Sequence, residues 1–187
     1  MIIAGIDYSL TCPGICVYDS DDGKFSFQNT HNYFRSNLQR FEMFNENRVC
    51  GENHGPWKTD EDRYDDIANW ALQILISKHS VDKIFIEGYS YGSSGKVFHI
   101  AENTAILKNY LWDEGLEFEI VPPTVIKKFA SGKGNANKEL MYESFENENP
   151  ETDLRSWLTP RSSNTISPVS DIVDAYFIAK YGYSICV

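Results

Sequence analysis

The sequence lacks the features that mark membrane-bound and secreted proteins. No stretch approaches the roughly 20 consecutive apolar residues that a membrane-spanning helix needs. The first residues, Met1 to Asp7, carry no basic flank and reach an acid too early for a secretory signal peptide. Only four cysteines occur in 187 residues, too few for a disulfide-rich scaffold. We therefore expect a reduced protein that acts in the cytoplasm and makes no contact with a membrane.

Positive charge is also scarce. The chain has 17 Lys and Arg against 27 Asp and Glu, a formal net charge of −10, which argues against a protein that coats nucleic acid through bulk electrostatics. Residues 127–138 are the exception, because they contain no acid and four lysines: Lys127, Lys128, Lys133 and Lys138. The residues between the lysines are small, and a predicted helix begins beside them. Together with the positive charge, these features suit contacts to the phosphates of a nucleic-acid backbone. A solvated basic loop is the alternative interpretation of this strip.

The order of predicted elements indicates an α/β fold in one domain that spans residues 1–187. Apolar runs and turn signals predict three antiparallel strands, followed by helix, strand, helix, strand and helices. The strands are expected near 2–7, 14–18, 25–27, 83–87 and 118–121. The helices are expected near 63–75, 97–112, 124–129 and 136–145 and from Pro168, with Asn135 and Ser167 as N-caps. The result is a mixed five-stranded sheet with helices on both faces.

Two segments show no clear periodicity. Residues 32–62 are polar and aromatic, with two glycines and a proline near their end, and are predicted to form an irregular insert. Residues 146–166 are acidic and then rich in Ser, Thr and Asn, and are predicted to form a mobile loop. The role of the insert is open, and capping a site or contacting a partner are both consistent with its composition.

Four acidic residues stand where buried elements end or begin. Asp7 ends the apolar run Ile2 to Ile6, and Glu87 ends the run Ile84 to Ile86. Asp171 and Asp174 are three residues apart at the start of the last predicted helix, so they share one face of it. Carboxylates at the ends of buried strands are costly unless a cation compensates them, and a few carboxylates with substrate phosphates form the typical Mg²⁺ site. The pattern predicts a metal-dependent phosphoryl-transfer site.

Simpler explanations exist for each acid taken singly. An aspartate in the first turn of a helix is favourable for the helix dipole alone, and a lone acid at a strand end is often a solvated turn residue. Cys12 and Cys16, together with Cys50 and His54, could suggest zinc, but their spacing is unusual and core packing is favoured. It is the occurrence of all four carboxylates in this order that favours the metal site.

The runs that end in Asp7 and Glu87 and the segment Asp171-Ile172-Val173-Asp174-Ala175 resemble the RuvC family of Holliday-junction resolvases, within the ribonuclease H-like nuclease superfamily. The resemblance covers about residues 1–31 and 63–183. It implies a ribonuclease H-like sheet and a DNA endonuclease in which the four acids bind two Mg²⁺ ions, which Mn²⁺ can replace. Metals roughly 3.5–4 Å apart would clamp the attacking water and the leaving oxygen. The resemblance also places Lys127 and Lys138 near the scissile phosphate.

Two positions depart from the family. Many members have glycine two places after the first aspartate, whereas this chain has Ser9, and in this it resembles the phage-type variants of the family. If the protein is phage-encoded, the expected location is the host cytoplasm. The family often has an aromatic residue three positions after its glutamate, where this chain has Ser90 between Tyr89 and Tyr91. Either tyrosine could stack on a base, and both could equally be aromatics at the rim of a loop.

The predicted function is hydrolysis of four-way or other branched DNA by a homodimer, because symmetric cleavage of a junction needs two active sites. One side of the helix near 97–112 offers either an interface or core packing: Val97, Ile100, Ala101, Thr104 and Leu107. An RNA- or RNA–DNA-hybrid-directed nuclease of the same superfamily and a non-catalytic branched-DNA-binding module are the alternatives. A sugar-kinase-like ATPase would need a second phosphate loop, and a DEDD exonuclease would need an acid where Ser9 stands. Four-way junctions, flaps and forks all remain open as substrates, as does any base-sequence preference.

Overall fold

The structure is a computed structural model that describes residues 1–89 and 97–187. One mixed β-sheet forms its centre, and the described residues contribute seven strands to it in the order β4-β5-β3-β2-β1-β6-β7. Their bounds are β1 Ile2–Asp7, β2 Gly14–Asp19, β3 Thr30–Ser36, β4 Phe44–Glu46, β5 Val49–Asn53, β6 Lys83–Glu87 and β7 Phe118–Val121. The strands β1, β2 and β3 are antiparallel neighbours, and β6 and β7 add to β1 in parallel. The α/β, ribonuclease H-like arrangement expected from the sequence is confirmed.

The predicted count of five strands is wrong, because the segment 32–62 extends the sheet. β5 pairs in parallel with β3, and β4 pairs antiparallel with β5. This segment was expected to be irregular, but it supplies most of β3, both added strands and the first residues of α1. Its polar residues fit a sheet because they bond within it: the Asn32 side-chain amide donates to Thr30 Oγ1 at 3.0 Å, and both residues are buried.

The third strand also lies further along the chain than the 25–27 predicted. The alternation of Phe25 and Phe27 reflects aromatic packing rather than a strand. The Phe25 ring lies 4.5 Å from that of Tyr18 and 5.2 Å from that of Tyr176, measured between centroids. Phe27 begins a short 3₁₀ turn and packs edge-on against Phe145. Both rings thus fill the core beside the C-terminal helix.

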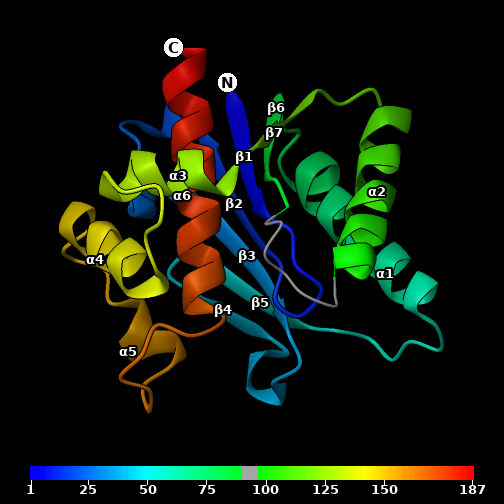
Figure 1. Ribbon diagram of the computed structural model, residues 1–187, viewed down its shortest axis with the longest axis horizontal. Coiled ribbons are helices and arrows are strands. Elements are labelled where there is room, and N and C mark those ends of the chain that lie inside the picture. The colour runs from blue at the N-terminus through cyan, green and yellow to red at the C-terminus, as the bar shows by residue number, and fades with distance from the viewer. Residues whose placement is uncertain (90–96) are drawn as a thin grey trace.

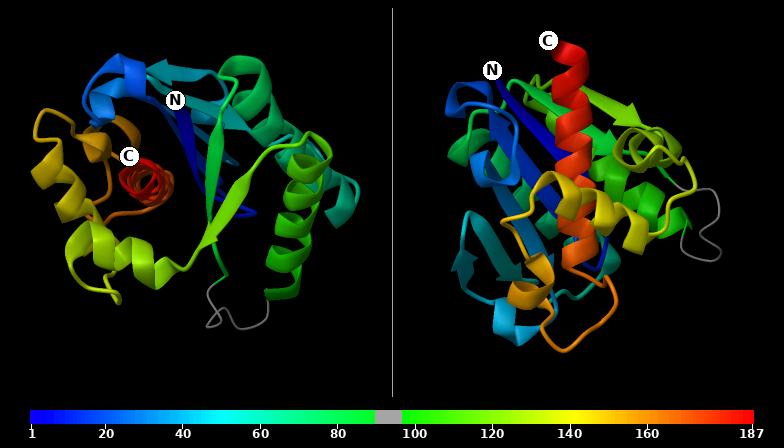
Figure 2. Two further views of the ribbon diagram at one scale, coloured as in Figure 1. Left: turned by 90° about the horizontal axis from the view of Figure 1, so that it is seen from above. Right: turned by 90° about the vertical axis from the view of Figure 1, so that its left-hand side faces the viewer.

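Helices cover both faces of the sheet, as expected (Figure 1). On one face lie α1 (Asp60–Leu72), which continues as a π-helical segment to Lys78, and α2 (Val97–Asp113). On the other lies α6 (Val169–Cys186), accompanied by α3 (Pro123–Ser131), α4 (Lys138–Glu148) and α5 (Leu154–Leu158). In the left view of Figure 2, α6 is seen end-on beside the sheet. Each face encloses its own hydrophobic core. None of the helices in the described ranges combines the length and hydropathy that crossing a membrane takes.

Three glycines allow α6 to lie directly on the sheet. A Cβ atom added at Gly5 of β1 would lie 2.1 Å from the backbone nitrogen of Ala179. A Cβ atom added at Gly14 of β2 would lie 2.6 Å from the carbonyl oxygen of Asp171. One added at Gly182 of α6 would lie 2.2 Å from the ring of Phe85. Because Gly14 pairs with Asp7 across β1 and β2, this close contact fixes the beginning of α6 beside the end of β1.

The helix starts differ from the predicted caps by one or two residues. Asn137, not Asn135, caps α4, and its side chain accepts from the Leu140 amide at 2.9 Å. Pro168, not Ser167, is the N-cap residue of α6. The segment 146–166, predicted as a mobile loop, contains α5, whose Leu154 and Leu158 side chains are buried in the core.

Candidate active site

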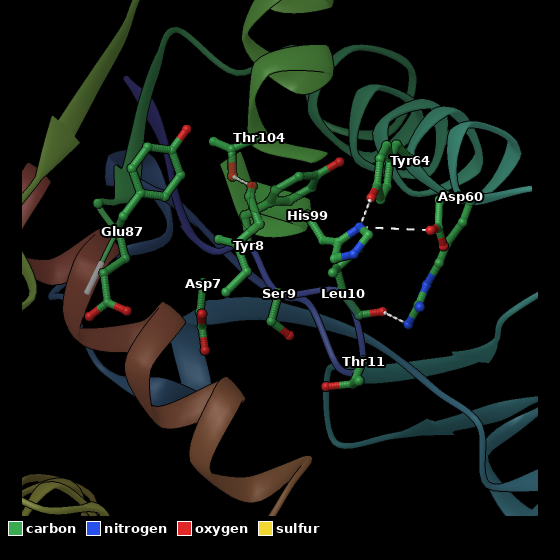
Figure 3. Close-up of a pocket in the computed structure, with 14 residues that line it drawn as sticks. Asp7, Tyr8, Ser9, Leu10, Thr11, Asp60, Tyr64, Glu87, His99 and Thr104 are labelled. Carbon is green, nitrogen blue, oxygen red and sulfur yellow. Dashed lines mark hydrogen bonds and ion pairs between the residues drawn. The ribbon is translucent and has the colours of Figure 1, made fainter. Parts of the chain in front are cut away.

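Two of the predicted carboxylates lie side by side at one edge of the sheet. Asp7 is the last residue of β1 and Glu87 the last residue of β6. These strands are parallel neighbours, with Ile6 paired to Ile86, so the residues that follow leave the sheet together. Figure 3 shows both carboxylates projecting in the same direction beside α6. The carboxyl ends of parallel strands are where α/β proteins commonly place their sites.

Asp171 and Asp174 complete the group from the first turns of α6. Asp171 is buried, and its neighbourhood is fixed by the contact between Gly14 and its own carbonyl oxygen. The Ser170 hydroxyl donates to Asp171 Oδ2 at 3.1 Å, and the charge of Asp171 adds to the effect of burial in raising the pKa of the Cys12 thiol. The structure therefore brings together all four acids that were singled out in the sequence.

The electrostatics show that these carboxylates interact strongly. Burial raises the pKa of Asp7 well above its usual value, and the charges of Glu87, Asp171 and Asp174 add to that shift. Burial also raises the pKa of Asp174 to about 8, with Glu87 and Asp171 contributing. Burial raises the pKa of Glu87 to about 7. Such shifts mark a concentration of negative charge that a cation would relieve.

Two of the four lysines in the basic strip reach this group. Lys138 Nζ donates to Ser170 Oγ at 3.1 Å, so Ser170 bridges Lys138 to Asp171. Lys127 of α3 lowers the pKa of both Glu87 and Asp174, against the effect of burial. Lys128 and Lys133 are exposed and contribute to none of these shifts. The strip is thus divided between two lysines at the carboxylates and two on the surface beside them.

Ser170 and Cys12 were not singled out as site residues in the sequence. Ser170 directly precedes Asp171, and a hydroxyl beside a functional acid at a helix start is a weak signal that could have identified it. Cys12 could not have been found this way, because it reaches Asp171 from the loop after β1. Cys12 and Cys16 are both buried and free, in agreement with the core role favoured over zinc.

The donor set fits a hard divalent cation. Carboxylate oxygens are the ligands that Mg²⁺ and Mn²⁺ prefer, and no side chain of the described residues forms an ion pair with any of the four acids. As the side chains stand, no three His, Cys, Asp or Glu groups within residues 1–89 and 97–187 are placed to hold a metal ion together. Binding would therefore require rotation of the carboxylates toward a common centre.

A cavity of about 600 Å³ opens from Asp7 and Glu87 toward α1 and α2 (Figure 3). The segment Tyr8 to Thr11 forms its floor, and residues of both helices form its far wall. Tyr89 lines it with 36% of its surface exposed, and Lys108 Nζ lies 5.8 Å from the centre of its ring. Tyr91, the other tyrosine predicted to contact DNA, lies outside the described residues. His99 of α2 also lines the cavity.

The fold is similar to that of solved RuvC-type Holliday-junction resolvases. The structure of Thermus thermophilus RuvC matches with a TM-score of 0.61 at 16% identity over 100% of this chain and 97% of that one. T. thermophilus RuvC in complex with a Holliday-junction substrate matches with 0.62 at 17% identity, over 96% and 90%. The yeast mitochondrial Holliday-junction resolvase Ydc2 matches with 0.55 at 14% identity, over 95% and 75%. No protein-family model matches the sequence, and no curated protein sequence matches it. At these identities the likeness establishes the fold.

Proposed function

We propose that this protein is a metal-dependent, structure-selective endonuclease that hydrolyses phosphodiesters in branched DNA, with four-way junctions as its main substrate. The observation that carries this proposal is the convergence of Asp7, Glu87, Asp171 and Asp174 at one sheet edge, with Lys127 and Lys138 beside them. The shared fold supports the choice of substrate, because the similar solved structures include resolvases, one of them bound to a Holliday junction.

The four carboxylates would hold the divalent ions, which when bound would supply a more acidic water and stabilisation of the leaving 3′-oxygen. The protein's own residues do the rest. Asp7 and Glu87, fixed at the ends of neighbouring strands, orient the site toward the phosphate. Lys138, held by Ser170, and Lys127 partly neutralise the phosphate as charge develops on it. The surrounding core excludes water from the rear of the site and strengthens these interactions.

The surface next to the site suits a DNA backbone on one side and bases on the other. Lys128 and Lys133 extend the basic strip away from the carboxylates, and we assign them to phosphate contacts. We assign Tyr89, which is partly exposed and lines the cavity, to stacking on a base at the branch point. Because the rest of the chain is acidic, binding should depend on these local contacts and weaken steeply with salt.

We further propose that the active unit is a two-fold dimer built on the outer face of α2. Phe98 and Trp112 are 79% and 78% exposed, and the exposed Ala105 lies midway between them. The seven-residue spacing places all three on one side of the helix. The opposite side, which the sequence offered as an interface or as core, is core at Thr104 and Leu107. A symmetric dimer would present two sites to the two cleaved strands of a junction.

A panel of labelled substrates tests the function: four-way junction, three-way junction, flap, linear duplex and RNA–DNA hybrid, each with Mg²⁺ and with chelator. Metal-dependent paired nicks at symmetric positions in the four-way junction are the expected result. Equal cleavage of four-way junctions, three-way junctions and flaps would broaden the substrate to branched DNA in general. Cleavage confined to the hybrid, or binding without cleavage of any substrate, would contradict the proposal in favour of an RNA-directed nuclease or a binding module.

A further inference from the structure

The cavity beside the carboxylates is larger than hydrolysis of a phosphodiester requires. Its volume of about 600 Å³ lies within the roughly 300–1,000 Å³ typical of sites that enclose a small organic group. It extends from Asp7 and Glu87 to the far wall formed by Asp60 and Tyr64 of α1 and His99 of α2. Figure 3 shows these three side chains grouped together, on the side of the cavity away from Asp7 and Glu87.

The far wall is held together by a hydrogen-bonded network. The Tyr64 hydroxyl lies 2.8 Å from His99 Nδ1 and donates to Glu102 Oε2 at 3.2 Å. His99 Nδ1 also lies 3.7 Å from Asp60 Oδ2 and 3.8 Å from Glu102 Oε2. Since the Tyr64 proton goes to Glu102, the Tyr64 oxygen accepts from Nδ1–H. This leaves His99 Nε2 as an acceptor, so the wall offers acceptors from His99 and Asp60 together.

The far wall of the cavity is unfavourable for a phosphate. It carries Asp60, and no lysine is among the described residues that line the cavity, whereas Asp7 and Glu87 at the other end belong to the carboxylate site. Arg63 lines the cavity as well, but its guanidinium donates to the Leu10 carbonyl at 2.6 Å and lies over the Trp57 ring. At the far wall an anion would therefore face the Asp60 carboxylate, whereas a neutral group with N–H donors would meet acceptors. The apolar lining from Leu10, Ile100 and Tyr89 favours a flat ring.

We propose that this cavity receives one unstacked base of the bound DNA, beside the cleaved nucleotide, and selects bases that carry an exocyclic amino group. Adenine, cytosine and guanine have such a donor and thymine has none. The inference rests on the proposed nuclease function, because the cavity opens onto the same carboxylates. His99 and Asp60 are the specificity-determining residues, and Tyr64 and Glu102 position His99. A base enters only once it has left the stack, as it can most easily at a branch point.

The test uses wild-type protein, Mg²⁺ and four-way junctions that differ by one base at each position flanking the mapped cut. Cytosine is exchanged for thymine, and adenine for purine, which lacks the amino group. At one position we expect loss of the amino group to slow cleavage about tenfold or more, as a site built for a donor rejects its analogue. His99→Ala and Asp60→Ala should reduce this preference to within about twofold.

Glu61→Ala is the matched control, because Glu61 is the neighbouring exposed acid in the same turn of α1 and does not line the cavity. It should keep the full preference. Cleavage by the wild type without any base preference, or a preference that survives both cavity variants, would overturn the base pocket alone. Absence of cleavage of every junction by the wild type would instead overturn the proposed function, and the pocket with it.

Discussion

Neutralising Asp174 should stabilise the metal-free protein, and the size of the effect can be worked from the structure. Burial and the neighbouring carboxylates raise its pKa from 3.8 to about 8. A group whose pKa is higher in the folded than in the unfolded state stabilises the fold at low pH. That contribution is lost as the pH rises from about 4 to about 8. One pKa unit corresponds to about 1.4 kcal/mol, so the shift sets a ceiling of about 6 kcal/mol on the loss.

Asp174→Asn keeps the shape of the side chain and removes its charge. The gain should be smaller than this ceiling, because Asp7 and Glu87 still ionise in the variant and still destabilise the fold. We expect the free energy of unfolding to rise by about 2 kcal/mol near pH 8.5 in chelator, and by almost nothing near pH 4. Urea unfolding followed by tryptophan fluorescence measures both values. Mg²⁺ should reverse the order, since it stabilises the wild type by binding the folded state. Glu143→Gln, an exposed acid on α4, serves as the control and should change little at any pH.

Equal stability of the wild type and Asp174→Asn at both pH values in chelator would refute this reasoning. It would mean that the four carboxylates are solvated well enough to ionise freely, and that no cation is needed to compensate them.

Three further predictions follow from individual contacts. Gly14→Ala should destabilise the protein by about 2–3 kcal/mol, because its methyl group would lie 2.6 Å from the Asp171 carbonyl, whereas Gly55→Ala, with open space around it, should leave the melting temperature nearly unchanged. Ser170→Ala removes the bridge between Lys138 and Asp171 and should lower kcat about tenfold with little change in junction affinity. An unchanged kcat would remove Lys138 from the mechanism. Trp112→Glu should convert the dimer to a monomer in light scattering, while Met43→Glu, at a site 91% exposed near β4, should leave it dimeric. A wild type that is monomeric, or a Trp112→Glu variant that stays dimeric, would rule out the α2 interface.

The parts of the fold that could be predicted are those whose signal is local. β1 and β6 are runs of apolar residues that end in an acid, and α6 begins with two acids at helical spacing. In each of these elements the local sequence indicates both the type of element and the residue at which it ends or begins. The order of the elements and the residues at the sheet edge could therefore be predicted directly. The convergence of those residues then followed from the rule that parallel strands end at the same edge.

What escaped prediction depends on contacts between distant segments. The polar run after Glu146 is ordered because Asn149 accepts from the Phe27 amide at 2.9 Å, 122 positions away, and donates to the Tyr176 hydroxyl. Likewise Arg155 bonds both Glu139 and Thr165. No local pattern marks such partners. The far wall of the cavity escaped for the same reason, since Tyr64 and His99 meet only when α1 packs against α2.

Cleavage of a four-way junction by the wild type and by Asp7→Asn, with binding measured in parallel, tests the central claim most directly. The negative charges of all three other acids raise the pKa of Asp7, so Asp7 interacts with each of them. Neutralising Asp7 should therefore abolish metal-dependent cleavage, while the junction still binds with near wild-type affinity. Full cleavage by Asp7→Asn in Mg²⁺, or wild-type cleavage that persists in chelator, would contradict the assignment of these carboxylates to a metal-dependent nuclease site.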